Sequence, residues 1–185
     1  MAQVESNARG IPKAPFVDKV EEYTTVGEVE TTLRKFQEMI SKYKYMEIHL
    51  LQRKKSLETK IPEIKKTLEM VQFLISNQDS STPLETHYEL NDTLWAKAKI
   101  NPSKTKTVNL WLGANVMLEY STAEAKDLLQ SKLDSAKTSL EQVDEDLEFL
   151  RDQITTMEVN TARVYNFDVK VRRKQKESGT GSGKE

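Results

Sequence analysis

The residues that could carry polar chemistry are few in this chain, and their spacing is wrong for a reaction centre. The two histidines, His49 and His87, lie far apart, and there is no cysteine, so neither a metal-ligand cluster nor a thiolate is available. The last residues, GTGSGKE, are similar to a phosphate-binding loop. However, Ser178 stands where that motif needs glycine, and Glu185 stands where Ser or Thr should follow the lysine. We therefore predict no catalytic residue, no metal and no cofactor, and a protein that is not an enzyme.

Apolar side chains at outer positions of two predicted helices are better candidates for a binding surface. Methionine adapts its shape and aromatic rings bring large area, so such side chains can bind varied apolar partners. The predicted binding residues, near the start of the first helix and the end of the second, are Met39, Tyr45, Met46, Ile48, Val159, Tyr165, Phe167 and Val169. The alternative, burial at the edge of the contact between the helices, stays open, above all for Met46 and Tyr165.

Two heptad repeats must position these residues. Alternate steps of four and three along residues 29–75 and along residues 129–171 meet apolar residues almost everywhere. The exceptions are Glu47, Lys54, Thr161 and Asp168. An apolar period of about 3.5 residues sustained over this length predicts a left-handed coiled coil.

The period changes between the helices. Residues 84–120 alternate apolar and polar side chains, with turn residues at 91–92 and 113–115, which predicts two β-hairpins. Ser121 and Glu124 have the spacing of a capping box that starts the second helix. The predicted segments are an irregular N-terminal arm without a clear period (1–25), a first helix (26–77), a turn (78–83), the hairpins (84–120), a second helix (121–172) and a flexible tail (173–185).

The predicted fold class is mainly α with a small β part, a long antiparallel two-helix coiled coil joined by two β-hairpins. Because the insertion between the helices is short, residues near Ile75 should meet those near Leu129, and residues near Phe36 those near Val164. On this register the charged seam residues have candidate partners. These are Arg151 for Glu47, and Asp144, Glu145 or Glu148 for Lys54, with outward-pointing charges as the alternative. Pro62 should bend the first helix without breaking it.

Each predicted strand places its apolar residues on one face, and that face needs a cover. The apolar stripes of the helices are used on each other, so we expect other chains to supply it, with the hairpins joining an oligomeric β-barrel. The predicted assembly residues are Leu90, Leu94, Trp95, Ile100, Val108, Leu110, Trp111, Leu112, Val116 and Leu118. Leu94, Leu110 and Leu112 are expected in the barrel interior. For Trp95 and Trp111, packing on the chain's own coil is an alternative.

Several sequence runs resemble the α class of prefoldin subunits, which carry two hairpins between their helices. They are KYKYME (42–47), IPEIKKTLE (61–69), ELNDTLWAKAKI (89–100), WLGANVMLEYSTAEA (111–125) and EDLEFLRDQITTMEVNTARVYNFDV (145–169). The resemblance covers roughly residues 10–173. The runs GANVMLEY and TTMEVNTARVYNFDV make it specific, because heptads alone are common.

The resemblance implies a chaperone subunit that acts without ATP. It implies a hetero-hexamer with five other prefoldin subunits, capture of unfolded actin and tubulin at the coiled-coil tips, and delivery to the cytosolic chaperonin. The eight outer apolar residues named above would then be client contacts. The expected location is the cytoplasm, with a nuclear pool left open.

Composition and the basic segment 170–176 bear on the remaining alternatives. A formal net charge of −1 gives no reason to expect nucleic acid or a membrane as partner. The segment KVRRKQK is interpreted first as cations at a helix C-terminus, and a patch that binds a partner stays open. A structural or tethering coiled-coil protein without chaperone activity is the alternative function, although such a spacer has no need of the hairpins.

Overall fold

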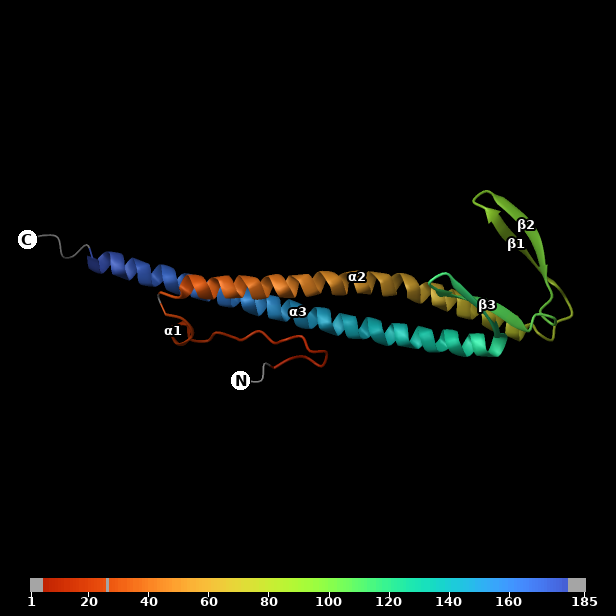
Figure 1. Ribbon diagram of the computed structural model, residues 1–185, viewed down its shortest axis with the longest axis horizontal. Helices are drawn as coiled ribbons and strands as arrows, with labels where there is room; N and C mark the ends of the chain where they lie inside the picture. Colours follow the sequence, from red (N-terminus) through yellow and green to blue (C-terminus); the bar gives the residue numbers. More distant parts are fainter. Residues whose placement is uncertain (1–4, 26, 180–185) are drawn as a thin grey trace, which may run out of the picture. The chain divides into compact units, whose positions relative to one another are not determined.

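The computed structural model describes residues 5–25 and 27–179, which form long helices and two β-hairpins (Figure 1). The elements are α1 (Val20–Tyr23), α2 (Val29–Ser76), β1 (Leu84–Asn91), β2 (Leu94–Ile100), β3 (Thr107–Gly113), β4 (Val116–Ser121) and α3 (Thr122–Gly179). The predicted fold class is confirmed. The chain divides into unit 1 (1–55 and 141–185) and unit 2 (56–140), and α2 and α3 contribute to both.

Both long helices follow the heptad repeat. α2 continues through Pro62 without a break, and Ile61 and Ile64 on either side of the proline pack in the same core. α3 extends to Gly179, past the end predicted at residue 172, because its last turns are rich in Lys and Arg, which favour helix and suit its C-terminus. A helix therefore replaces the start of the predicted flexible tail. Residues 180–185, with most of the loop-like run, lie outside the described residues.

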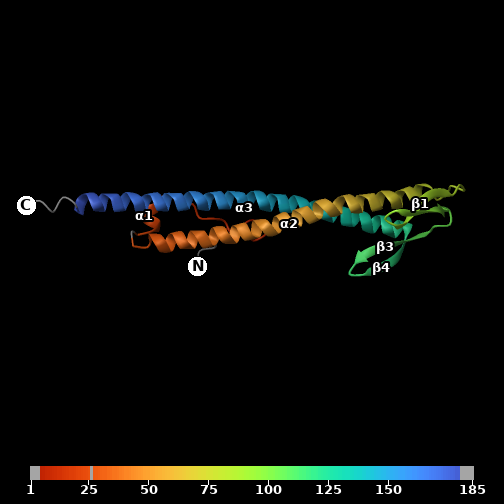
Figure 2. The same ribbon diagram turned by 90° about the horizontal axis from the view of Figure 1, so that it is seen from above.

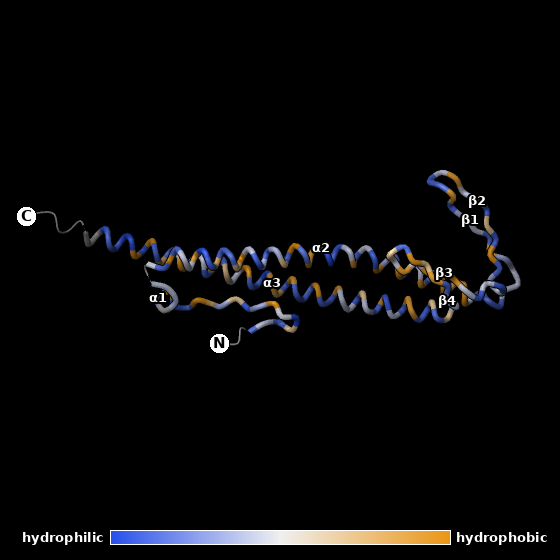
Figure 3. The backbone as a smooth tube through the Cα atoms, viewed as in Figure 1, coloured by the Kyte–Doolittle hydropathy of each residue, from blue (hydrophilic) through white to orange (hydrophobic). Residues whose placement is uncertain are grey.

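In unit 1, α2 and α3 run antiparallel and bury a contiguous seam. Phe36, Tyr43, Leu150, Met157 and Val164 are at most 2% exposed and belong to one cluster. Figure 3 shows hydrophobic and hydrophilic residues alternating along both helices, as a seam with polar outer faces requires. Phe36 and Val164 share this cluster, so this part of the predicted register is confirmed.

One of the predicted charge pairs across the seam is present in unit 1 and the other is not. Lys54 Nζ lies 2.7 Å from Asp144 Oδ1, which confirms that pairing. Glu47 and Arg151 form no ion pair within the described part of the chain, so this prediction is wrong. The Arg151 side chain is exposed, and water competes with such a pair.

In unit 2, the seam residues Leu68, Val71, Ile75, Leu129 and Leu133 form a second cluster. Ile75 and Leu129 meet there, which confirms the other part of the register. The two hairpins are separate two-stranded sheets (Figure 1 and Figure 2). None of the helices in the described ranges combines the length and the hydropathy that a membrane span requires.

The hairpin registers agree with the predicted alternation. In the first hairpin Leu84 pairs with Ile100 and Tyr88 with Ala96, so the apolar residues share a face. In the second, Leu110 pairs with Leu118. The second turn places Ala114 and Asn115 at φ values of 49° and 60°, the left-handed conformation that a two-residue hairpin turn requires.

The second hairpin overturns the expectation that the helices cannot cover a strand face. Leu110 is buried, and Val108 and Tyr120 are half-buried, in the cluster formed by α2 and α3. A seam between two helices stays open on its remaining sides, and Ala125, which is fully buried, belongs to the same cluster as Leu110. Leu110 therefore packs on its own coil in this structure and not in a barrel interior.

Candidate functional site

The arm (residues 5–25) is docked along the coil of unit 1, where the sequence predicts an irregular segment (Figure 1). Ala14 and Val17 are buried, and Ile11 and Val20 are half-buried against the same cluster. These four residues recur at every third position, which is the period of a polyproline II helix and not of an α-helix or a strand. Pro12 and Pro15, between them, suit that conformation. The period of three was the sequence signal for this docking, and a search for helix and strand periods misses it.

Side chains of α2 and α3 bind the main chain of the arm directly. Gln153 Oε1 accepts from the Ala14 N–H at 2.8 Å. Asn160 accepts from the Val17 N–H at 3.0 Å and donates to the Pro15 carbonyl at 2.6 Å. An amide that both accepts and donates holds an extended backbone in one register.

Two further donors complete this set of contacts. The Tyr43 hydroxyl donates to the Pro12 carbonyl at 2.9 Å, and Arg163 Nη1 donates to the Val17 carbonyl at 2.8 Å. Burial raises the pKa of Tyr43, so its hydroxyl keeps the proton that it donates. We call the surface formed by Tyr43, Gln153, Asn160 and Arg163, with the apolar cluster beneath, the arm groove.

A charged contact holds the first part of the arm. Arg9 lies 2.8 Å from Glu145 and 2.7 Å from Asp146, and Asn7 donates to Asp146 at 2.7 Å. Asp146 and Gln153 are seven residues apart, and Asn160 follows after seven more, so the three polar side chains occupy the same heptad position of α3. Each is at most 6% exposed and binds the arm. Polar residues that recur every seven positions beside an apolar seam are a second sequence pattern that indicates the groove.

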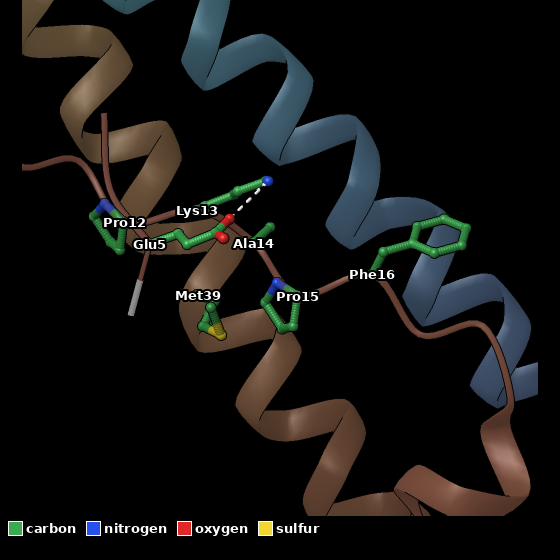
Figure 4. Close-up of a pocket in the computed structure, with 7 residues that line it drawn as sticks. All are labelled: Glu5, Pro12, Lys13, Ala14, Pro15, Phe16 and Met39. Atoms are coloured by element: carbon green, nitrogen blue, oxygen red, sulfur yellow. Dashed lines mark hydrogen bonds and ion pairs between the residues drawn. The ribbon is translucent and has the colours of Figure 1, made fainter. Parts of the chain in front are cut away.

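An open pocket lies between the arm and α2 (Figure 4). Pro12, Pro15, Phe16 and Met39 line it, with the ion pair of Lys13 and Glu5 at 2.8 Å on one side. Met39 and Pro15 lie near one another in Figure 4. Phe16 is 60% exposed and stacks under the Arg163 guanidinium, 4.9 Å from the ring centroid.

The predicted client-binding residues all belong to unit 1 and fall into two groups. Tyr45, Ile48, Val159 and Tyr165 are exposed. Met39, Met46, Phe167 and Val169 are half-buried. Met39 and Met46 pack against the cluster that includes the arm, and Phe167 lies in a pocket with Asp18 and Val20. The sequence did not predict that the arm would cover part of this surface.

The predicted assembly residues also divide into covered and uncovered sets. Leu110 is buried, while Ile100, Val108 and Leu112 are half-buried. The uncovered residues are Leu90, Leu94, Trp95, Trp111, Val116 and Leu118. Trp95 and Trp111 are each more than half exposed, and neither belongs to a core cluster. Within the described ranges, no three His, Asp or Glu side chains gather as a metal site would require.

The geometry defines a coiled-coil subunit with an uncovered hairpin and exposed apolar side chains, and the comparisons agree with that class. Residues 43–167 match the model of the prefoldin subunit family. The chain therefore belongs to the prefoldin family, as the sequence runs predicted.

Its relatives are named prefoldin subunit 3. The chain is 60% identical to that of Elsinoe fawcettii, an alignment that covers 95% of this chain and 89% of the relative. It is 54% identical to the probable prefoldin subunit 3 of Schizosaccharomyces pombe over 92% of this chain and 98% of the relative. For the Homo sapiens protein the identity is 48%, over 89% and 84%. A structure of filamentous PFD from Methanocaldococcus jannaschii aligns with a TM-score of 0.40 and 14% identity, over 60% of this chain and 93% of that chain.

Family membership fixes the class of activity. Prefoldin subunits are parts of a chaperone and not enzymes, so the chain is a prefoldin chaperone subunit that assembles with other prefoldin subunits.

Proposed function

We propose that this chain is one of six different subunits of an ATP-independent chaperone in the cytoplasm. The assembly captures unfolded proteins, notably actin and tubulin, on apolar side chains of unit 1 and delivers them to the cytosolic chaperonin. Its hairpins join those of the five other subunits in a β-barrel.

One observation carries the capture step. Tyr45, Ile48, Val159 and Tyr165 are each at least 41% exposed, although the seam of unit 1 is already filled by other residues. Tyr45 also stacks edge-on against His49, with the ring centroids 4.4 Å apart. Large apolar side chains that the fold does not need can bind apolar segments of a client.

A second observation supports the assembly. Tyr88, Leu90 and Leu94 of the first hairpin are each at least 58% exposed. An isolated two-stranded hairpin is marginally stable in water, so this apolar face favours a partner. A spacer or tether, the alternative function, gains nothing from such a face.

The test is to replace Tyr45, Ile48, Val159 and Tyr165 with Ser in the reconstituted hexamer. We expect the hexamer to form and its suppression of actin aggregation to fall about tenfold or more, because several apolar contacts are lost together. The control replaces Met70 and Phe73, which are exposed apolar residues of α2 in unit 2, with Ser. Native mass spectrometry checks assembly. Unchanged suppression by the intact fourfold variant would refute the assignment of these residues.

A further inference from the structure

The arm groove recognises its occupant mainly through the occupant's backbone. Five hydrogen bonds join α2 and α3 side chains to main-chain groups of residues 12–17. Asn160, which makes two of them, has no exposed surface. Contacts of this kind do not depend on the side chains of the occupant, so the groove places few demands on its sequence.

The side chains that enter the groove are small and regularly spaced. Ala14 and Val17 are buried, whereas Lys13, Phe16 and Asp18 around them are exposed. The groove therefore accepts an extended segment with a small apolar residue at every third position. Proline fits at positions 12 and 15, where the groove supplies donors to the carbonyls and needs no N–H.

Polyproline II is also a major conformation of unfolded chains, with its main-chain groups unpaired. Residues 13–17 of the arm form neither helix nor strand, so an unfolded polypeptide can present its main chain in the same way, and they lie on the unit that carries the proposed client contacts. Met39, half-buried beside Ala14 and Pro15 of the arm, would gain exposure if the arm left.

We propose that the arm groove is a binding site for extended segments of unfolded polypeptides, and that the arm is an internal occupant which such segments displace. This inference rests on the proposed chaperone function. To that function it adds a defined binding site within unit 1. It also adds the arm as an internal competitor of the client segments for that site.

The expected affinity of the arm groove for a free segment follows from the covalent link between the arm and α2. A short covalent tether gives the arm an effective concentration of about 1 mM, so an arm that is docked about 90–99% of the time corresponds to a free peptide Kd of roughly 0.01–0.1 mM. Removing the arm should then raise the apparent affinity for a client segment on the order of 10–100-fold.

The first experiment measures binding of a fluorescein-labelled peptide of residues 5–20 to a chain that lacks residues 1–20. We expect binding in the stated range by fluorescence anisotropy, and much weaker binding to the full chain, whose groove is occupied. A peptide with Ala14→Asp and Val17→Asp is the matched control, because it keeps the backbone and loses the apolar contacts. Asn160→Leu in the shortened chain should abolish binding of the unmodified peptide. Absence of peptide binding to a shortened chain with normal helicity would overturn the inference.

The second experiment keeps the full chain. Arg9 and Glu145, whose side-chain ends lie 2.8 Å apart, are both replaced by cysteine. The chain has no cysteine of its own, so these are its only two thiols. A short bis-maleimide joins them before assembly and locks the arm. We expect the locked hexamer to capture denatured actin about tenfold less well than the same variant without the cross-link. The labelled peptide should compete with actin on a hexamer that contains the shortened chain.

The outcomes separate the inference from the function on which it rests. Equal capture of actin by locked and unlocked hexamers overturns the inference and leaves the proposed function in place. Peptide binding without competition against actin does the same. Hexamers that capture no actin in any form overturn the proposed function together with this inference.

Discussion

Single polar residues at buried heptad positions decide which segment packs beside the coil. Three buried polar residues occupy positions of α3 next to the apolar seam, namely Asp146, Gln153 and Asn160. Apolar residues at these positions would make the apolar stripe wider and would offer no hydrogen bond. A buried amide without a partner costs about 1–3 kcal/mol, so each of these residues favours the one arrangement that satisfies it. The arm satisfies all three, and the structure leaves no buried side-chain N or O atom of the described residues without a hydrogen bond.

The Lys54–Asp144 pair should contribute little to stability despite its short distance. The side chains are 34% and 49% exposed, so water screens the pair. We expect a double-mutant cycle with Lys54→Met and Asp144→Asn to give a coupling energy of about 0.5 kcal/mol, from urea unfolding followed by circular dichroism. The coupling should shrink at high salt. A value several times larger, or one insensitive to salt, would mean that the pair is more desolvated than the structure indicates.

At the scale of elements, the capping box fixes the point where the second hairpin becomes α3. The Glu124 carboxylate accepts from the Ser121 N–H at 3.1 Å and the Ser121 hydroxyl at 2.8 Å, and the Glu124 N–H donates to Ser121 Oγ at 3.2 Å. These hydrogen bonds lower the pKa of Glu124 below its ordinary value of 4.5. The charged form is therefore the one that stabilises the start of the helix.

This pKa shift has a defined sign for stability. Because the pKa is lower in the folded state, the contribution of Glu124 is present above pH 4.5 and is lost as the pH falls through the folded-state pKa. We expect Glu124→Gln to lower the unfolding midpoint most at neutral pH, and the gap to wild type to close under acid conditions. Glu141→Gln, at an exposed site within α3, is the control. A gap that stays constant or widens in acid would contradict the assignment.

The elements could be predicted from sequence wherever one short period governs a long segment. The heptads in α2 and α3, the alternation around Leu84 and Ile100 and the spacing of Ser121 and Glu124 all have local causes. The docking of Val17 and Leu110 could not be predicted in the same way. It depends on the side of the seam that two helices leave open, and on which third element reaches it. The docking of these two elements therefore depends on tertiary packing. For the arm, the apolar period of three residues is nevertheless visible in the sequence.

At the scale of the molecule, the same physical requirement recurs in both units. A two-helix seam leaves one side uncovered, and a third element fills it, the arm in unit 1 and the β3–β4 hairpin in unit 2. Among the described residues, those of the β1–β2 hairpin belong to neither cluster. Tyr88, Leu90 and Leu94 remain exposed, and under the proposed function this apolar face contacts other prefoldin subunits.

Charging that face should prevent assembly without unfolding the chain. In Tyr88→Asp with Leu94→Asp, two exposed residues of β1 and β2 become carboxylates, which would be costly to bury against a neighbouring subunit. We expect the helicity of the isolated chain to be unchanged and its incorporation into the hexamer, measured by native mass spectrometry, to be lost. Thr93→Asp, in the turn between the two strands, adds charge outside the face and should assemble normally. Normal incorporation of the double variant would show that this face is not an assembly surface. Loss of helicity would instead show that it supports the fold of its own chain.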